Sequence, residues 1–576
     1  MRKISTLIVV LAVIFLAGTG WAFDLTILHV NDSHSYLDAT EGKLTPDGTK
    51  TEVQLGAWAR LTAAMESARR QNENTALLHA GDAVQGGLYF MKYGGKPEME
   101  FLTRLKFDAM TLGNHEFDKG ADYLAGFLEY TDVPILGANI NASGVPKLAK
   151  QLKPYTILSF GDERVGVIGL TTKDTQFVSS PGPGVIFADE AETARTYIKE
   201  LEEQGVDKII LLTHVGLGHD KKLAAEVAGV DVIVGGHSHS LLADPDAMQA
   251  MGESVDGTYP VVVKGVDGND VYVVTSWKWG RVLGRLNISF DESGNVTAAT
   301  GTPVLLVADD FKRKDEAGNW SPVTGEVRQK ILDDFAQSSV ANVVVEDAAA
   351  AAFLAPFSDG VQSMRTDAIG VAAKSLPNIR VPGVTGSGIS LPHGSLIAPL
   401  VARSMLEKFD TTGIGADMAL QNAGGVRDGV NRGNITVGTA YMLLPFGNTL
   451  CVLDATGQQI KSALEYGVTR GRGAFPYVAG ARYTADMNQP EGHRVTSVDM
   501  LNAAGKWEPL EMARTYRLVT NSYLARGGDG YDMFKSISKR YDTGFVDAQA
   551  FIEFVKKQKI VAPPKSTGVT YVPAKP

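Results

Sequence analysis

The chain contains one cysteine and no excess of basic residues. Cys451 is the only cysteine among 576 residues, so the protein has no internal disulfide and must rely on core packing. Lys and Arg total 55 against 65 Asp and Glu, which gives a formal net charge of −10. Proteins that coat nucleic acids or lie on membrane surfaces present basic faces, so neither role is expected here. An anionic ligand would have to be attracted locally, by metal ions or by a few arginines.

Long apolar runs are also missing, apart from one at the N-terminus. Residues 1–22 begin with two basic residues, continue with an apolar segment and end in the small-residue sequence GWA. This order is typical of a signal peptide. An uncleaved membrane anchor is the alternative, but the apolar segment is short for a span of roughly 20 residues. We expect a periplasmic or secreted protein with no stable membrane insertion after cleavage.

The length and the order of segments predict two domains. A chain of 576 residues is too long for one core. From residue 24, strand-like and helix-like segments alternate, and after residue 260 hairpins with Asp-Gly and Ser-Gly turns follow. The alternation predicts parallel strands joined by helices, and the hairpins predict a second sheet. We therefore expect an α/β fold, with a layered sandwich over residues 23–306.

The rest of the chain is expected to form a connector, a second domain and a tail. Residues 307–340 are charged and helix-prone, which is typical of a connector. Residues 341–558 combine helical and strand-like segments and predict an α+β domain. Residues 559–576 contain four prolines and little to bury, so we expect an extended tail.

Polar side chains follow five strand-like segments of the first domain. The segments read ILHVNDSH, LLHAGD, MTLGNH, IILLTH and VIVGGHSH. The carboxyl ends of parallel strands meet at one edge of a sheet, where such folds place their sites. Five of the ten histidines fall in these loops, so chance clustering is a poor explanation. The side chains brought together would be Asp32, His34, Asp82, Asn114, His115, His214, His237 and His239.

Most of these side chains match the ligands of a dinuclear metal site. Imidazole, carboxylate and amide oxygen together suit two borderline divalent ions such as Zn, Mn or Co. Two such ions about 3.5–4 Å apart can activate a water molecule and clamp a phosphoryl oxygen. We expect Asp82 to bridge the two ions. One ion would take Asp32, His34 and His239, and the other would take Asn114, His214 and His237.

His115 and Asp118 have a different predicted role. His115 is left without a metal ion, and Asp118 follows it three residues later. An imidazole held by a carboxylate is suited to general acid or base catalysis on a substrate. His29 and His79 lie on strands just before ligand residues, and we expect them to be core or supporting residues rather than ligands.

The order of these motifs resembles a known family. NDSHS, GD, GNHEFD, TH and GGHSH follow one another as in the calcineurin-like metallophosphoesterase domain of the 5′-nucleotidases. The segments QNAGGVRDG, LLPFGNTL and NSYLARGGDGYDMF resemble the nucleotide-binding domain of the same family. The resemblance implies a four-layer α/β/β/α sandwich, a second domain that binds substrate, and removal of phosphate from nucleoside 5′-monophosphates.

The resemblance also implies the substrate contacts. Asn422 and Arg427 would hold phosphate, which guanidinium groups bind in a bidentate manner. Phe446 and Tyr523 would sandwich the base, because aromatic faces stack on any base. Asp529 would accept hydrogen bonds from the ribose hydroxyls.

One segment departs from the family pattern. The family carries an arginine shortly before a Leu-Gly-Asn-Leu helix start, whereas the helix start here reads LPHGSLIAPL and the nearest upstream arginine is Arg380. Arg380 is therefore assigned as a further phosphate contact. The segments LPNIRVPG, GSLIAPLVA and GAFPYVAG look like those of periplasmic NAD nucleotidases, which split the dinucleotide pyrophosphate and then dephosphorylate the products.

Several activities remain open on this ligand set. A plain 5′-nucleotidase, an NAD or UDP-sugar pyrophosphatase and a 2′,3′-cyclic phosphodiesterase share the metals. A dimanganese thiosulfohydrolase is an alternative, but thiosulfate offers no base or ribose to Phe446, Tyr523 and Asp529. A non-enzymatic nucleotide receptor would not need His115 and Asp118. Substrate would lie between the domains, and the resemblance implies a domain rotation, which we place at 307–340.

Overall fold

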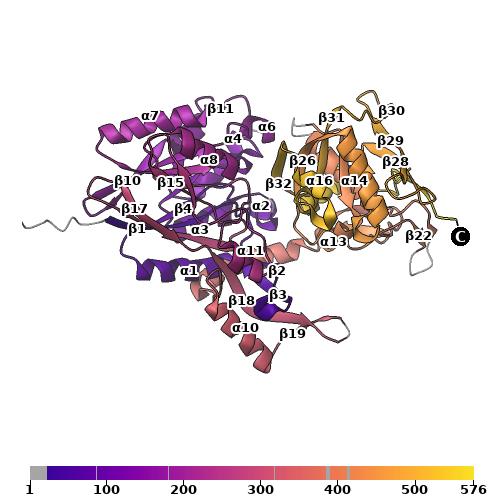
Figure 1. Cartoon of the computed structure of the whole chain (residues 1–576), viewed down its shortest axis with the longest axis horizontal. Coiled ribbons are helices and arrows are strands. Elements are labelled where there is room, and N and C mark those ends of the chain that lie inside the picture. The colour runs from indigo at the N-terminus through magenta and orange to yellow at the C-terminus, as the bar shows by residue number, and fades with distance from the viewer. Residues whose placement is uncertain are drawn as a thin grey trace, which may run out of the picture.

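The computed structural model describes residues 23–85, 87–179, 181–316, 318–384, 390–410 and 415–575, so the expected signal peptide lies outside the described residues. Within these ranges no helix combines the length and the apolar character needed to cross a membrane. In Figure 1 the N-terminal half of the chain lies at the left and the C-terminal half at the right.

Two sheets form the centre of the first domain. The strands of the larger sheet are, in spatial order, β2 (Ala39–Leu44), β3 (Thr51–Gly56), β18 (Val304–Lys314), β16 (Val282–Phe290), β1 (Phe23–Val30), β4 (Thr75–His79), β5 (Ala109–Thr111), β6 (Ile135–Leu136) and β8 (Leu152–Lys153), with β17 (Val296–Gly301), β19 (Trp320–Pro322) and β20 (Ala341–Val343) at its side. The second sheet contains β14 (Val261–Lys264), β15 (Asp270–Val274), β13 (Val232–Val234), β12 (Lys208–His214), β10 (Glu163–Thr171) and β9 (Tyr155–Phe160).

The two sheets pack face to face, and helices cover their outer faces. Ile27 and Leu78 of the larger sheet share one buried cluster with Val167, Leu212 and Val234 of the second sheet. The helices α1 (Trp58–Gln71) and α3 (Lys96–Arg104) pack on the larger sheet, and α7 (Glu190–Glu203) and α8 (Leu217–Glu226) pack on the second. Every residue of β12 is buried, as expected for a parallel strand covered on both sides. The predicted four-layer α/β/β/α order is confirmed.

Shorter elements complete the first domain. They are α2 (Leu88–Tyr93), α4 (Ala121–Phe127), α5 (Pro146–Gln151), α6 (Thr175–Val178), α9 (Pro245–Ala250), β7 (Ile140–Asn141) and β11 (Ile186–Phe187).

The segment expected to be a connector, 307–340, packs on the first domain instead. β18 pairs with β3 and β16, β20 pairs with β18, and α10 (Gly325–Gln337) lies between them in the chain. The next helix, α11 (Ala348–Met364), packs on α1 and α2. Just after α11, the carbonyl oxygen of Arg365 accepts a hydrogen bond from the amide of Gly438, which belongs to the second domain. The chain therefore passes between the domains after Met364.

The second domain is built on a mixed sheet of five strands. In spatial order these are β27 (Pro476–Ala479), β24 (Met418–Asn422), β31 (Thr515–Asn521), β26 (Thr449–Thr456) and β32 (Arg540–Val546). The main helices are α12 (Ala398–Asp410), α13 (Val437–Leu443), α14 (Gly457–Arg470) and α17 (Asp547–Gln558), with the short α15 (Ser522–Ala525) and α16 (Asp532–Lys535). β32 is an edge strand, and it lies on the side that faces the first domain (Figure 1).

Small sheets surround this core. They contain β21 (Ala368–Ala372) with β25 (Gly433–Thr436) and β33 (Ile560–Val561); β28 (Ala481–Asp486) with β29 (Val495–Leu501), β30 (Trp507–Pro509) and β34 (Val569–Val572); and the pair β22 (Gly383–Val384) and β23 (Ser390–Leu391). The segment expected to be an extended tail thus contributes two paired strands, β33 and β34.

Candidate active site

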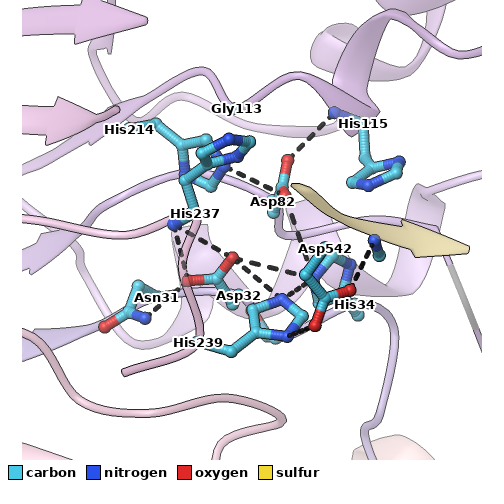
Figure 2. A network of polar contacts seen from close by, with 12 residues as sticks. Asn31, Asp32, His34, Asp82, Gly113, His115, His214, His237, His239 and Asp542 are labelled. Atoms are coloured by element: carbon cyan, nitrogen blue, oxygen red, sulfur yellow. Dashed lines mark hydrogen bonds and ion pairs between the residues drawn. The ribbon is translucent and has the colours of Figure 1, made fainter. Parts of the chain in front are cut away.

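The predicted metal ligands meet at the carboxyl ends of strands from both sheets. Asp32 and His34 follow β1, Asp82 follows β4, and His214 ends β12. Figure 2 shows these side chains converging with those of His237 and His239. The fold therefore brings together loops that lie far apart in the sequence.

The backbone at these positions adopts a rare conformation. Asp32, His34, Asp82, His237 and His239 have φ angles of 51°, 48°, 53°, 78° and 49°. A positive φ is uncommon for residues other than glycine and carries strain, which tends to collect at functional sites. The loops thus hold these side chains in positions that relaxed turns would not give.

Asp32, His34 and His239 form the first candidate metal site. The Nε2 atoms of the two histidines lie 2.9 Å apart. Asp32 Oδ1 lies 3.3 Å from Nε2 of His239 and 3.7 Å from Nε2 of His34. Three such atoms supply three of the four ligands of a tetrahedral shell, or half of an octahedral one.

Asp82, His214 and His237 form the second candidate site. Asp82 Oδ2 lies 3.0 Å from His214 Nε2 and 3.8 Å from His34 Nε2, so this carboxylate faces both sites. Burial would raise the pKa of Asp82, but nearby histidines, His214 first among them, outweigh burial and lower it. The carboxylate form that a metal requires is therefore favoured.

Unpartnered buried atoms test whether metal ions fit here. His214 Nδ1 lies 2.7 Å from the carbonyl oxygen of Ala80. Donation of the Nδ1 proton to Ala80 leaves Nε2 unprotonated, and this atom makes no hydrogen bond of normal geometry although Asp82 Oδ2 lies 3.0 Å away, as expected for two ligands of one ion. Asn114 Oδ1 is likewise buried without a partner. Bare imidazole nitrogen and amide oxygen beside carboxylates are the donor set that Zn, Mn or Co accepts.

His115 is held at the edge of the two sites. Its Nδ1 lies 2.7 Å from Asp118 Oδ2, and Asp118 Oδ1 accepts a 2.8 Å hydrogen bond from Ser179 Oγ. Burial would lower the pKa of His115, but Asp118 and Asp82 outweigh burial and raise it to about 9. His115 belongs to neither candidate metal site.

Two supporting residues were not predicted from the sequence. Glu116 accepts hydrogen bonds from the backbone amides of Asp82 (3.0 Å), Ala83 (2.8 Å) and Gly113 (2.6 Å), so it ties the loop of Asp82 to the loop of Asn114. Asn31 donates to Asp32 Oδ2 at 2.6 Å and to the carbonyl oxygen of Trp277 at 2.8 Å. Asn31 stands next to the predicted ligand Asp32, and Glu116 stands two residues after Asn114; that position in the sequence was the only available signal.

His29 and His79 are not part of the candidate metal sites. His29 Nε2 lies 2.7 Å from the hydroxyl of Tyr259, and His79 Nε2 lies 2.6 Å from Ser33 Oγ. Both are fully buried, and burial lowers the pKa of each to about 3.

The residues expected to bind the nucleotide form a second cluster. Asn422 Nδ2 donates to Asp529 Oδ2 at 2.8 Å, and the hydroxyl of Tyr523 donates to Asp529 Oδ1 at 3.0 Å. The guanidinium of Arg427 lies 5.5 Å from the ring centre of Phe446. Phe446 and Tyr523 are 49% and 47% exposed, so about half of each side chain is open to solvent.

One predicted arginine is not joined to this cluster by any recorded contact, and another arginine stands beside it. Arg380 is exposed and makes no contact that the structure records in its described residues. Arg472, which the sequence did not single out, lies in a turn (Arg472–Ala474) that contacts both the turn after β24 (Ala423–Gly425) and the turn Gly528–Gly530. It is a further basic residue at the nucleotide cluster.

The second domain covers the metal centre with β32. Asp542 Oδ2 lies 3.7 Å from His239 Nδ1, and the ring of Phe545 lies 5.3 Å from the ring of His115 (Figure 2 shows the strand beside Asp542). Gly544 passes so close to His115 Nε2 that a Cβ atom there would collide with it. Within the described ranges, no hydrogen bond, ion pair or ring contact joins the nucleotide cluster to the metal ligands.

Comparisons with known proteins cover nearly the whole chain. Residues 25–241 match the calcineurin-like phosphoesterase family, and residues 379–536 match the 5′-nucleotidase C-terminal domain. A probable 5′-nucleotidase of Treponema pallidum is 36% identical over 553 residues, which cover 93% of this chain and 92% of that protein. The structure of the Haemophilus influenzae NAD nucleotidase, 34% identical, superposes with a TM-score of 0.85 and covers 96% of this chain and 100% of that one. The structure of a 5′-nucleotidase precursor from Thermus thermophilus is 37% identical with the same coverage, and its TM-score is 0.58.

These matches span both domains and agree with two candidate metal sites at the strand ends of the first. The chain therefore belongs to the 5′-nucleotidase family, and the protein is a metal-dependent phosphoester hydrolase.

Proposed function

We propose that the protein is exported, removes phosphate from nucleoside 5′-monophosphates and also splits nucleotide pyrophosphates such as NAD or a UDP-sugar. The observation that carries the proposal is the facing pair of candidate metal sites with His115 beside them. The full-length likeness to an NAD nucleotidase supports the pyrophosphate activity. Residues 1–22, with their basic start and apolar centre, support export.

The metal ions would be held by the seven residues predicted as ligands. Two divalent ions of Zn, Mn or Co, when bound there, would activate water and neutralise charge on the phosphoryl oxygens. Asp82 would contribute to both sites, since its carboxylate faces both. Glu116 and Asn31 would keep Asp82 and Asp32 in place through their hydrogen bonds.

His115 would supply the proton that the leaving group needs. Water adds to phosphorus and gives up a proton to solvent, the bond from phosphorus to the 5′ oxygen breaks, and that oxygen takes a proton from His115 Nε2, which then regains one from solvent. Asp118 holds the other ring nitrogen, so the ring stays oriented and its positive charge is stabilised. The products are a nucleoside and inorganic phosphate. With a dinucleotide, the bond that breaks is the one between the bridging oxygen and phosphorus.

The second domain would hold the nucleoside. Phe446 and Tyr523 would stack on the base, and Asp529 would bind the ribose hydroxyls. Asn422, Arg427 and Arg380 would contact phosphate. The solvent exposure of the two aromatic rings supports this role.

A domain rotation would bring the nucleotide to the metals. β32 now covers the metal centre, so bound nucleotide cannot reach it in this arrangement. The Thermus and Haemophilus structures have similar identity to this chain, yet their TM-scores differ. Two domains placed differently would produce such a difference, which supports a mobile junction. The end of α11, at residues 364–367, is the position that the contacts favour, in place of 307–340.

Turnover assays with AMP, NAD and thiosulfate test the proposal. The full chain, loaded with Mn or Zn, should hydrolyse AMP to adenosine and NAD to mononucleotides and then nucleosides, and leave thiosulfate intact. Hydrolysis of AMP without NAD would restrict the protein to monophosphates. Release of sulfate from thiosulfate would favour the thiosulfohydrolase alternative, and nucleotide binding without turnover would favour a receptor.

A further inference from the structure

Lys278 is a buried cation beside the metal centre. It is 8% exposed and lies in the loop after β15. The residues on either side tie this loop to the ligand loop: the carbonyl oxygen of Trp277 accepts from Asn31 at 2.8 Å, and the amide of Trp279 donates to the carbonyl oxygen of Asp32 at 2.8 Å. Lys278 is therefore anchored directly next to a predicted metal ligand.

No carboxylate pairs with Lys278. Across the described ranges it makes no ion pair and no hydrogen bond, and its Nζ lies 4.3 Å from the ring centre of Trp279. Burial, together with Arg526, lowers the pKa of Lys278 to about 7. A buried ammonium without a partner costs folding free energy, so such a group indicates a binding role.

A carboxylate of the second domain interacts electrostatically with this lysine. Asp542 Oδ2 on β32 lies 3.7 Å from His239 Nδ1, and although burial would raise the pKa of Asp542, His239, Lys278 and Arg526 favour its charged form and lower that pKa. Its Oδ2 atom is buried and accepts no hydrogen bond. Figure 2 shows this carboxylate projecting from β32 toward the metal ligands. A negative charge is therefore favoured at the place that Asp542 occupies, but Asp542 Oδ2 forms no hydrogen bond there.

We propose that Lys278 is a specificity-determining residue that binds the second phosphoryl group of a diphosphate substrate while the first lies at the metal centre. The inference rests on the proposed pyrophosphate activity. Asp542 belongs to the second domain and would leave with β32 when that domain rotates, whereas Lys278 stays beside Asp32. A phosphoryl oxygen would then take the place of the carboxylate. A nucleoside monophosphate has no second group to put there.

Binding of two phosphonates tests this role directly. Methylenediphosphonate carries two phosphoryl groups and methylphosphonate carries one, and neither is hydrolysed. Calorimetry on the Mn-loaded full chain should show that Lys278→Met weakens methylenediphosphonate binding by about 10- to 100-fold, the value of a hydrogen bond to a charged group. Methylphosphonate affinity should fall by a clearly smaller factor. Lys278→Arg should restore most of the lost affinity.

Lys199→Met is the matched control, because Lys199 lies on α7 with 78% of its side chain exposed. It should bind both phosphonates as the wild type does. Metal content is measured in every variant, so that loss of an ion is not read as loss of a contact. An equal loss of affinity for both phosphonates, or no loss for either, would overturn the role of Lys278. NAD turnover by the wild type decides the pyrophosphate activity separately, since the calorimetry needs no turnover.

Discussion

The metal centre and the nucleotide cluster are built in opposite ways. At the metal centre, Asp32 and His214 are completely buried, and their side chains are fixed by Asn31 and by the backbone at Ala80. At the nucleotide cluster, Phe446 and Tyr523 are each about half exposed. The first region is organised before substrate arrives, as electrostatic catalysis requires, whereas the second gains its partner only when a base stacks on it.

The difference predicts which kinetic parameter each region controls. Groups that act on the reacting phosphoryl contribute mainly in the transition state, so their loss lowers kcat. Groups that hold the base contribute equally to the ground and transition states, so their loss raises KM. The predictions below use this division.

Asp82→Asn should have the largest effect. Its carboxylate faces both candidate metal sites, so the change should weaken both, and metal content should fall from about two ions per chain to fewer than one. His239→Ala should lower the metal occupancy of mainly one site. Metal analysis after dialysis measures this, with the exposed Asp162→Asn as control. Equal losses in the Asp82 and His239 variants would show that Asp82 does not bridge.

His115→Asn should separate catalysis from metal binding. His115 belongs to neither candidate metal site, so both ions should stay bound while kcat falls by about 10²–10⁴, the usual contribution of a positioned acid or base. Metal analysis and steady-state kinetics with AMP check the two parts, with the exposed His493→Asn as control. If the His115 variant lost an ion, His115 would be a ligand.

Phe446→Ala and Tyr523→Ala should act on KM. Each stacking face is worth about 1–3 kcal/mol, so KM for AMP should rise by roughly 5- to 150-fold with little change in kcat. The baseless ester p-nitrophenyl phosphate should be hydrolysed almost as before. Trp507→Ala removes a ring that is 40% exposed on β30 and contacts Arg482 rather than the cluster, and it serves as control. An equal loss of kcat/KM with both substrates would show that these rings stabilise the fold of the domain and do not bind the base.

The fold could be predicted from the sequence where a strand has a clear hydropathy pattern and pairs with strands close to it in the chain. β12 has an apolar centre, and its strand neighbours β10 and β13 stand just before and just after it in the chain, so its type and place could be predicted. The place of β18 could not be predicted from the sequence. Only its first half is apolar, and its charged second half pairs with β3, about 250 residues earlier in the chain. The tail was missed for the same reason: β34 is short and pairs with the distant β28. The hydropathy pattern within one segment does not show which distant strand it pairs with.

The residues of the candidate site also fall into a group that the sequence predicts and a group that it does not. The predicted ligands stand at strand ends, and the chemistry of imidazole and carboxylate in those loops was sufficient to group them. Glu116, Lys278 and Asp542 were missed because each gains its role from a neighbour across the fold. Asp542 in particular lies in the other domain, and no spacing along the chain connects it to His239.

Gly544→Ala should have the smallest effect, and it tests where the two regions meet. A Cβ atom at this position would collide with His115 in the present arrangement, so the variant should favour arrangements in which β32 has moved away. Small-angle scattering should show a changed mean shape, and p-nitrophenyl phosphate, which needs only the metal centre, should be hydrolysed a few-fold faster.

Gly544 has a φ of +67°, so alanine also costs roughly 1 kcal/mol of backbone strain. Gly492→Ala is the matched control, since Gly492 has a φ of +89° and nothing within 4 Å of its Cβ position. It should carry a similar strain without changing shape or turnover. If both variants behaved alike, contact between β32 and His115 would not limit access to the metal centre.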